Sequence, residues 1–279
     1  MAFDIYETVT NRILEQLEQG VIPWRKTWNG SEPRNYVTQK QYRGINLLLL
    51  PYGGEYLTFK QAKEAGGSVK RGEKSHMIVF FKMLDKTDEK TGEAEKFPYL
   101  KYSNVFHITQ CEGIETKMEP ISAENENEPE EAAQNIIDNY VKRTGVNVEL
   151  INGSNKACYA PADDKITMPV IQQFNTTNDY YSVFFHEAAH STGHENRLKR
   201  LEKAAAFGSH SYSKEELIAE ITACMLMNFT QIEIPETFEN SVSYIKSWSQ
   251  KLKDDKRMIV TAANAAQKAT DLILGITTE

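Results

Sequence analysis

Cysteine is scarce in this sequence, and the few cysteines are not paired along the chain. The 279 residues include three, Cys111, Cys158 and Cys224, which lie far apart and form no Cys-x-x-Cys motif. That spacing excludes a dense disulfide framework and a cysteine-type zinc finger. We therefore expect small, buried, reduced thiols of the kind found in cytosolic proteins.

Long apolar runs are also missing. The most apolar stretch, residues 45–50, is far too short to span a bilayer. Residues 1–4 lack the basic start and the apolar run of a secretory signal. The sequence therefore predicts a soluble, cytoplasmic protein with no membrane partner.

Acidic residues outnumber basic ones, but unevenly. The chain has 32 Lys and Arg against 39 Asp and Glu, a formal net charge of -7. Residues 1–118 hold 17 basic and 15 acidic residues, net +2, which leaves 15 and 24, net -9, for the rest. Such asymmetry predicts two parts with different partners. Between them, residues 119–131 are acidic and contain no Lys or Arg, as in a solvated linker.

The spacing of apolar residues predicts an α+β protein of two domains, 1–118 and 132–279, joined by the linker 119–131. In the first domain we expect a helix at 6–19, a short helix after Thr58, and a hairpin of strands at 75–83 and 99–108. The second domain should contain helices at 132–141, 178–192, 213–230, 236–252 and 254–274, with short strands at 146–150, 158–160 and 165–168.

The stretch His186-Glu187-Ala188-Ala189-His190 has the spacing of a metal-binding helix. Two histidines four residues apart share one helix face and can bind one ion. This is the H-E-x-x-H arrangement of zinc metalloproteases, in which the glutamate is the general base. We expect His186 and His190 to bind Zn²⁺, with Mn²⁺ or another divalent metal as alternatives, and Glu187 to activate a water molecule.

A catalytic zinc needs a third protein ligand and an open position for water. Glu216 and Glu220 lie four residues apart on the expected helix 213–230. We expect Glu216 to bind the metal and Glu220 to orient a ligating histidine, although the reverse assignment stays open. Ser213 as N-cap would give Glu216 a capping-box role that competes with metal binding. Glu215 is expected to face solvent.

Three further polar residues lie close to this motif in the sequence. The metzincin pattern requires histidine where this chain has Asn196, so His194 is only an alternative ligand. His210 and Tyr212, in the expected loop before the helix 213–230, are candidates for stabilising an oxyanion.

Aromatic and basic residues alternate in the first domain. Residues 21–82 contain eleven Lys and Arg against four Asp and Glu, net +7. Basic side chains can follow a phosphate backbone while flat rings stack on unpaired bases. The same composition fits a packed aromatic corner under a solvated basic surface equally well. The candidate DNA-binding residues are Trp24, Arg25, Lys26, Trp28, Arg34, Asn35, Tyr42, Arg43, Asn46, Lys70 and Lys74.

Taken together, motifs in both domains resemble the ArdC-type antirestriction proteins of plasmids, phages and conjugative elements, including the N-terminal region of TraC-type primases. The resemblance rests on Pro23-Trp24, Tyr42-Arg43-Gly44-Ile45-Asn46, Gly72-Glu73-Lys74, His186-Glu187 with His190, Thr192-Gly193, Arg197-Leu198 and Glu215-Glu216-Leu217-Ile218-Ala219-Glu220. One departure is Ala188-Ala189, where the family often carries leucine.

This resemblance implies a single-stranded-DNA-binding N-terminal domain and a zincin-like metallopeptidase C-terminal domain. It implies protection of incoming DNA from host restriction and an unknown protein substrate. Two other functions stay open. One is an intracellular zinc metallopeptidase whose N-terminal half binds a protein partner. The other is a DNA-binding protein in which the zincin fold only stabilises the structure.

Overall fold

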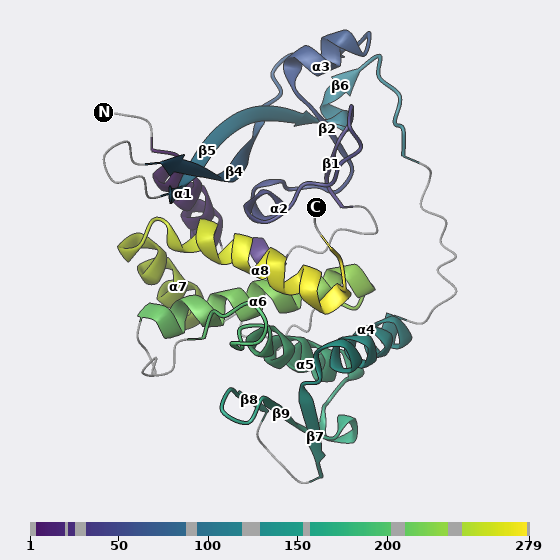
Figure 1. The fold of residues 1–279 in the computed structure, drawn as a ribbon. Helices are drawn as coiled ribbons and strands as arrows, with labels where there is room; N and C mark the ends of the chain where they lie inside the picture. Colours follow the sequence, from purple (N-terminus) through teal and green to yellow (C-terminus); the bar gives the residue numbers. More distant parts are fainter. Residues whose placement is uncertain are drawn as a thin grey trace.

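The computed structural model describes residues 4–19, 22–25, 32–87, 94–118, 129–152, 157–201, 210–233 and 242–277. Within these ranges the chain is α+β, as predicted (Figure 1). No helix there is long and apolar enough to cross a membrane. The three cysteines are unpaired: Cys111 and Cys224 are buried, whereas Cys158 is half-buried.

The N-terminal half begins with helix α1, Ile5–Glu18, close to the predicted 6–19. The Asp4 side chain caps it by accepting from two backbone N–H groups, and its apolar face is buried. Two shorter helices follow, α2 (Ile45–Leu49) and α3 (Phe59–Glu64). Thr58 forms a capping box with Gln61 at the start of α3, which confirms the predicted cap.

A curved sheet of four strands accompanies these helices in the order β1-β2-β5-β4. Its strands are β1 (Arg34–Asn35), β2 (Glu55–Leu57), β4 (His76–Thr87) and β5 (Ala94–His107), and β3 (Ser68–Val69) pairs separately with β6 (Cys111–Glu112).

The hairpin of β4 and β5 is longer than its predicted strands. It pairs His76 with Val105 at one end and Thr87 with Ala94 at the other. Residues 84–87 and 94–98, which lie outside the predicted strands at 75–83 and 99–108, therefore belong to β4 and β5. A ribbon that extends beyond its sheet has neighbours on one edge only, so charged residues there do not oppose strand formation.

In its described residues, the C-terminal half contains a small sheet and five α-helices. The sheet has the order β7-β9-β8, with β7 parallel and β8 antiparallel to the central strand. These elements are α4 (Pro129–Thr144), β7 (Asn147–Ile151), β8 (Cys158–Ala160), β9 (Lys165–Pro169), α5 (Thr177–Ser191), α6 (His210–Thr230), α7 (Val242–Asp254) and α8 (Met258–Leu274).

One boundary prediction near this half is wrong. Residues 129–131, assigned to the linker, form the first turn of α4; the rest of the linker, 119–128, lies outside the described residues. Acidic side chains at a helix start are favoured by the helix dipole, so Glu130 and Glu131 suit that turn. Strand β7 is mostly exposed.

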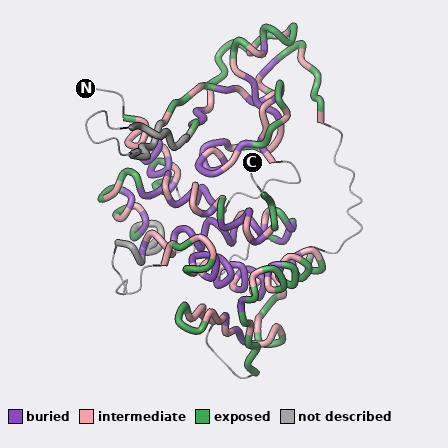
Figure 2. Tube along the Cα trace, in the orientation of Figure 1, coloured by how far each residue is buried: buried purple, intermediate pink, exposed green. Residues whose placement is uncertain are grey.

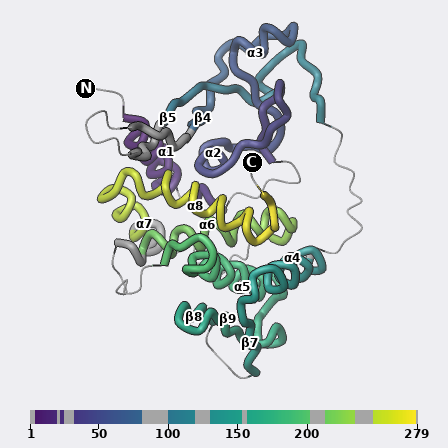
Figure 3. The backbone as a smooth tube through the Cα atoms, in the orientation of Figure 1, coloured from purple at the N-terminus to yellow at the C-terminus, as the bar shows by residue number. Residues whose placement is uncertain are grey.

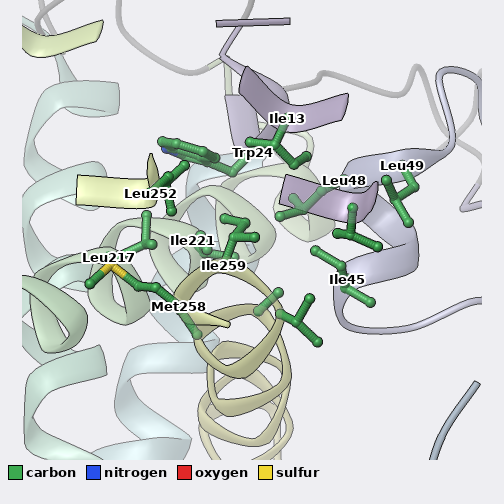
Figure 4. Packing of buried hydrophobic residues seen from close by; sticks show 14 of the residues in the cluster. Ile13, Trp24, Ile45, Leu48, Leu49, Leu217, Ile221, Leu252, Met258 and Ile259 are labelled. Atoms are coloured by element: carbon green, nitrogen blue, oxygen red, sulfur yellow. The ribbon is translucent and has the colours of Figure 1, made fainter. Parts of the chain in front are cut away.

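The two halves share one large hydrophobic cluster, and each half also has apolar clusters of its own. In Figure 4, residues of α1, the Trp24 segment and α2 pack directly against residues of α6, α7 and α8. The labelled members are Ile13, Trp24, Ile45, Leu48, Leu49, Leu217, Ile221, Leu252, Met258 and Ile259. The two predicted segments are therefore packed against each other through this shared cluster.

The helices form a stack of layers between the two sheets. The N-terminal sheet lies on one side of α8, and the small sheet lies beyond α5 on the other (Figure 3). Buried residues follow α5, α6 and α8 through the middle of this stack (Figure 2). Helix α6 is the central member, since it packs on both α5 and α8.

Candidate metal centre

Helix α5 carries the H-E-x-x-H residues in its last turns. It begins with a capping box between Thr176 and Asp179, one residue from the predicted start. Tyr180, Phe184 and Phe185 are buried in the core of the C-terminal half. The helix is thus fixed by its cap and by its apolar face, which holds the two histidines in place.

The three predicted metal ligands lie together. The Nε2 atoms of His186 and His190 are 3.1 Å apart. The two carboxylate oxygens of Glu216 are close as well: Oε2 lies 3.6 Å from Nε2 of His186, and Oε1 lies 3.7 Å from Nε2 of His190. Two nitrogens bound tetrahedrally to one zinc are about 3.3 Å apart, given Zn–N bonds of about 2.0–2.1 Å. The side chains therefore fit a single divalent ion.

The electrostatic environment also favours a cation. Burial lowers the pKa of His186, but hydrogen bonding to Glu216 and the charges of nearby carboxylates outweigh it, so that pKa is raised. These carboxylates belong to Glu187, Glu216 and Glu220. A group of acidic residues that attracts a proton to an imidazole also attracts a metal ion to it.

Glu187 faces a large cavity beside these ligands. Glu187 is buried, with 9% of its surface exposed. The cavity has a volume of about 720 Å³ and is lined by Tyr159, His186, Glu187, His190, Arg200 and Lys214, among others. A peptide segment reaching the ligands would therefore also reach the carboxylate that the sequence assigns as the general base.

Glu215 does not face solvent, which corrects the sequence prediction. Its side chain is 13% exposed, and one of its oxygens lies 3.4 Å from Nδ1 of His190. Burial raises the pKa of Glu215, but hydrogen bonds from His190 and Arg200 outweigh it and hold that pKa below its usual range. The sequence does not show this contact, because the burial of Glu215 depends on Arg200, a residue of another segment that compensates the carboxylate charge.

Helix α6 begins at His210, three residues before the predicted start. Ser213 is therefore inside the helix, where it is buried, and its predicted role as N-cap is wrong. The competing capping role for Glu216 disappears with it. His210 and Tyr212 lie in the first turn rather than in a loop, and their side chains are outside the described part of the structure.

Two other predicted roles near the site have different outcomes. Among the described residues, the group able to hold a metal consists of His186, His190 and Glu216, without His194. Nδ1 of His194 instead accepts a hydrogen bond from the backbone of Asn196. Glu220 is buried and raises the pKa of His186 electrostatically, after the larger effects of burial and Glu216, so its role as an orienting residue stays a prediction.

Several candidate DNA-binding residues are committed to internal contacts. Trp24 is 3% exposed and packs edge-to-face on Trp248, with ring centroids 6.4 Å apart. Tyr42 is likewise buried and packs edge-to-face on Tyr56. Neither ring is free to stack on a base, so for these two residues the packed-corner alternative holds.

The same is true of polar residues in this group. The Asn46 amide donates to the carbonyl of Val79 and accepts from its N–H, at 2.8 and 2.7 Å. Arg43 forms an ion pair with Asp271 of α8. Asn35 accepts hydrogen bonds from the backbone of residues 37 and 38, which closes a turn. These side chains stabilise the fold and the contact between the halves.

The remaining candidates divide into exposed and undescribed residues. Lys70 and Lys74 are exposed, and Lys70 also donates to the carbonyl of Thr109. Arg34 is half-buried, and within the described ranges its Nε has no hydrogen-bond partner. Lys26, Trp28 and the side chain of Arg25 lie outside the described residues.

Known protein families match both halves of the chain. Residues 3–106 match the N-terminal domain of the anti-restriction factor ArdC, and residues 135–265 match a zincin-like metallopeptidase. Two crystal structures of the antirestriction ArdC protein from plasmid R388 are similar over nearly the whole chain. The Mn(II)-bound structure is 36% identical with a TM-score of 0.77 and 98% of each chain covered; the metal-free one is 38% identical with a TM-score of 0.73 and 97% covered.

Longer and uncharacterised proteins also match. DNA primase TraC of Escherichia coli is 33% identical over 96% of this chain, which spans 27% of the primase. The uncharacterised protein y4eC of Sinorhizobium fredii is 30% identical, with 96% of this chain and 91% of that protein covered. The chain therefore belongs to the ArdC family of antirestriction proteins, with an ArdC N-terminal domain followed by a zincin-like metallopeptidase domain.

Proposed function

We propose that this protein protects DNA from restriction by binding single-stranded DNA through its N-terminal half and by using a metal-dependent, peptidase-type site in its C-terminal half. The meeting of His186, His190 and Glu216 at one point, in a member of this family, carries the proposal. Zn²⁺ or Mn²⁺ is the expected ion, and the Mn(II)-bound relative supports the second.

The protein's own residues suggest how hydrolysis would proceed. When bound, a divalent metal lowers the pKa of a water molecule to about 7 and polarises the carbonyl under attack. Glu187, which follows the first expected ligand, would act as the general base: it would take a proton from the attacking water and give it to the leaving amine. The cavity beside the ligands accepts the peptide.

Replacing the base tests this mechanism. Glu187→Gln should keep the metal and the fold but lose hydrolysis, because the amide cannot take a proton. Metal content, thermal unfolding and cleavage of unfolded casein would be measured on the same preparations. Full cleavage by the metal-loaded variant would rule out Glu187 as the base.

Antirestriction is tested by plasmid transfer. A plasmid entering as a single strand should reach a restricting host more often when the recipient makes this protein. The Glu187→Gln variant shows whether that protection requires the peptidase-type site. Equal transfer with and without wild-type protein would contradict the antirestriction proposal.

DNA binding is proposed for the exposed basic residues of the N-terminal half. Lys70, Arg71 and Lys74 are exposed on the turn after β3, and Lys60 and Lys63 are exposed on α3. Charges that remain accessible can contact phosphates without unpacking the core. This surface replaces Trp24, Tyr42 and Asn46, whose side chains are used internally.

Salt titrations of the full-length protein with a labelled oligonucleotide test this surface. Removing one lysine that binds a phosphate should reduce the slope of log K against log salt by about 0.7. Lys70→Ala with Lys74→Ala should therefore lower the slope by about 1.4. Lys142→Ala, an exposed lysine of α4, is the matched control. No binding at low salt would favour a protein partner for this half.

A further inference from the structure

Arg200 and Glu215 form a largely buried ion pair beside Nδ1 of His190. Arg200 donates to both oxygens of Glu215, with its Nε 3.1 Å from one and its Nη2 2.8 Å from the other. Each of the two side chains is 13% exposed. The carboxylate that approaches Nδ1 of His190 is therefore held by two hydrogen bonds rather than by a flexible single bond.

Arg200 also binds the end of the metal helix. Its Nη1 donates to the hydroxyl of Thr192 at 2.8 Å, and its Nη2 donates to the carbonyl of Ala189 at 3.0 Å. One guanidinium thus connects the last turn of α5, which bears His190, to the first half of α6, which bears Glu215 and Glu216. These hydrogen bonds fix the position of α5 relative to α6, and the two helices together supply the three expected metal ligands.

Gly193 makes room for this arrangement. A Cβ at this position would lie 2.9 Å from Leu201 and 3.2 Å from Nη2 of Arg200. It would also lie 3.1 Å from the carbonyl oxygen of His190, which belongs to the backbone and cannot easily move. A side chain here would displace the guanidinium, so the glycine that follows the H-E-x-x-H motif has a steric reason to be there.

We propose that Glu215 and Arg200 are positioning residues for the metal site, a proposal that rests on the metal-binding part of the proposed function. Glu215 accepts a hydrogen bond from Nδ1 of His190, which leaves the lone pair of Nε2 directed at the ion. Arg200 holds Glu215 in place and compensates its charge. Carboxylates that orient ligating histidines in this way commonly change metal affinity about 10- to 100-fold when removed.

A purely structural ion pair is the competing explanation, and it makes a different prediction. Removing one partner of a buried pair destabilises a protein, whereas replacing both by apolar residues of similar size is often neutral. The double variant Glu215→Leu with Arg200→Met should therefore recover the stability lost through the unpaired charge in Glu215→Gln, while still lacking the hydrogen bonds of Arg200 to Thr192 and Ala189. If the pair positions His190, the double variant should not recover metal affinity.

The experiment is a Zn²⁺ titration of wild type, Glu215→Gln and the double variant, with thermal unfolding of each metal-free protein. Arg197→Lys is the matched control, because Arg197 binds the same helix end through the carbonyl of Ser191 but pairs with Asp164 instead of Glu215. We expect a Kd for Zn²⁺ about 10- to 100-fold higher in Glu215→Gln and the double variant, and less than threefold higher in the control.

Co²⁺ loading adds a readout that stability does not affect. A displaced histidine changes the coordination geometry, so the visible absorption spectrum of the Co²⁺ protein should shift in both Glu215 variants and stay unchanged in Arg197→Lys. Wild-type affinity and spectrum in the double variant would overturn the positioning role. If wild type itself bound neither Zn²⁺ nor Co²⁺, the metal site and this proposal would fail together.

Discussion

At the scale of single residues, burial decides whether a side chain of a DNA-binding type can actually contact DNA. The motif Tyr42-Arg43-Gly44-Ile45-Asn46 combines rings, charge and amides as a DNA-binding segment does. In the structure its members are used within the protein: a buried ring, an ion pair with α8, and an amide bound to a strand backbone. A sequence identifies chemical groups, but whether a group is free depends on neighbours that are distant in the chain.

The metal ligands were easier to predict because their geometry is local. The spacing of His186 and His190 fixes their relative position on any helix. Glu216 was within reach of prediction because a zinc site needs a third ligand. Glu215 was not, because its burial depends on Arg200, a residue of a turn with no periodic pattern.

His107 should make stability depend on pH. Its Nε2 lies 2.8 Å from the carbonyl of Gly53 and its Nδ1 lies 2.8 Å from the hydroxyl of Thr109. Burial lowers the pKa of His107 below its ordinary value of 6.5. As pH falls below that value, the unfolded chain binds a proton before the folded one, so the free energy of unfolding decreases.

Urea unfolding at pH 7.5 and pH 5.5 measures this effect. Wild type should lose more stability between these pH values than His107→Gln, whose side chain does not titrate there. Equal losses in the two proteins would contradict the assignment of a lowered pKa to this residue.

At the scale of elements, α6 has two functions at once. Glu215 and Glu216 face the metal helix, while Leu217 and Ile221 lie in the core shared with the N-terminal half. Its start was missed because Ser213 and Glu216 imitate a capping box within the helix. The full length of the β4–β5 hairpin was missed because its charged residues are as typical of turns as of strand ends.

Shortening one core residue of α6 should destabilise the whole protein. Ile221 is fully buried, so Ile221→Ala should lower the free energy of unfolding by about 2–5 kcal/mol, because it removes buried apolar surface and leaves a cavity. Ile276, which is 43% exposed, provides the matched control: Ile276→Ala should change it by less than about 0.5 kcal/mol. Chemical denaturation measures both, and similar values would contradict the proposed importance of the shared core.

At the scale of the whole molecule, the sequence predicted the helices and strands of each half, but not the hydrophobic cluster that packs the halves together. Apolar periodicity shows which face of a helix is buried, not which element buries it. The shared core joins Ile13 of α1 to residues near Ile259 of α8, positions almost the full chain apart. Such pairings could not be read from local patterns.

Cooperative unfolding should reveal that the two halves are packed together. We expect calorimetry of the full chain to show one main transition, because separating the halves exposes the core they share. A fragment of residues 1–118 should bind a hydrophobic dye and lack a sharp transition. Two well-separated transitions, or a fragment as stable as the full chain, would show that the halves fold independently.

The shared core also has a consequence for gene fusion. A gene fusion can transplant a segment intact only if the cut leaves no core residue without its partner. In this protein a cut between the halves would separate Trp24 from Trp248 and Arg43 from Asp271. The match to the TraC primase likewise covers both halves together, over 96% of this chain.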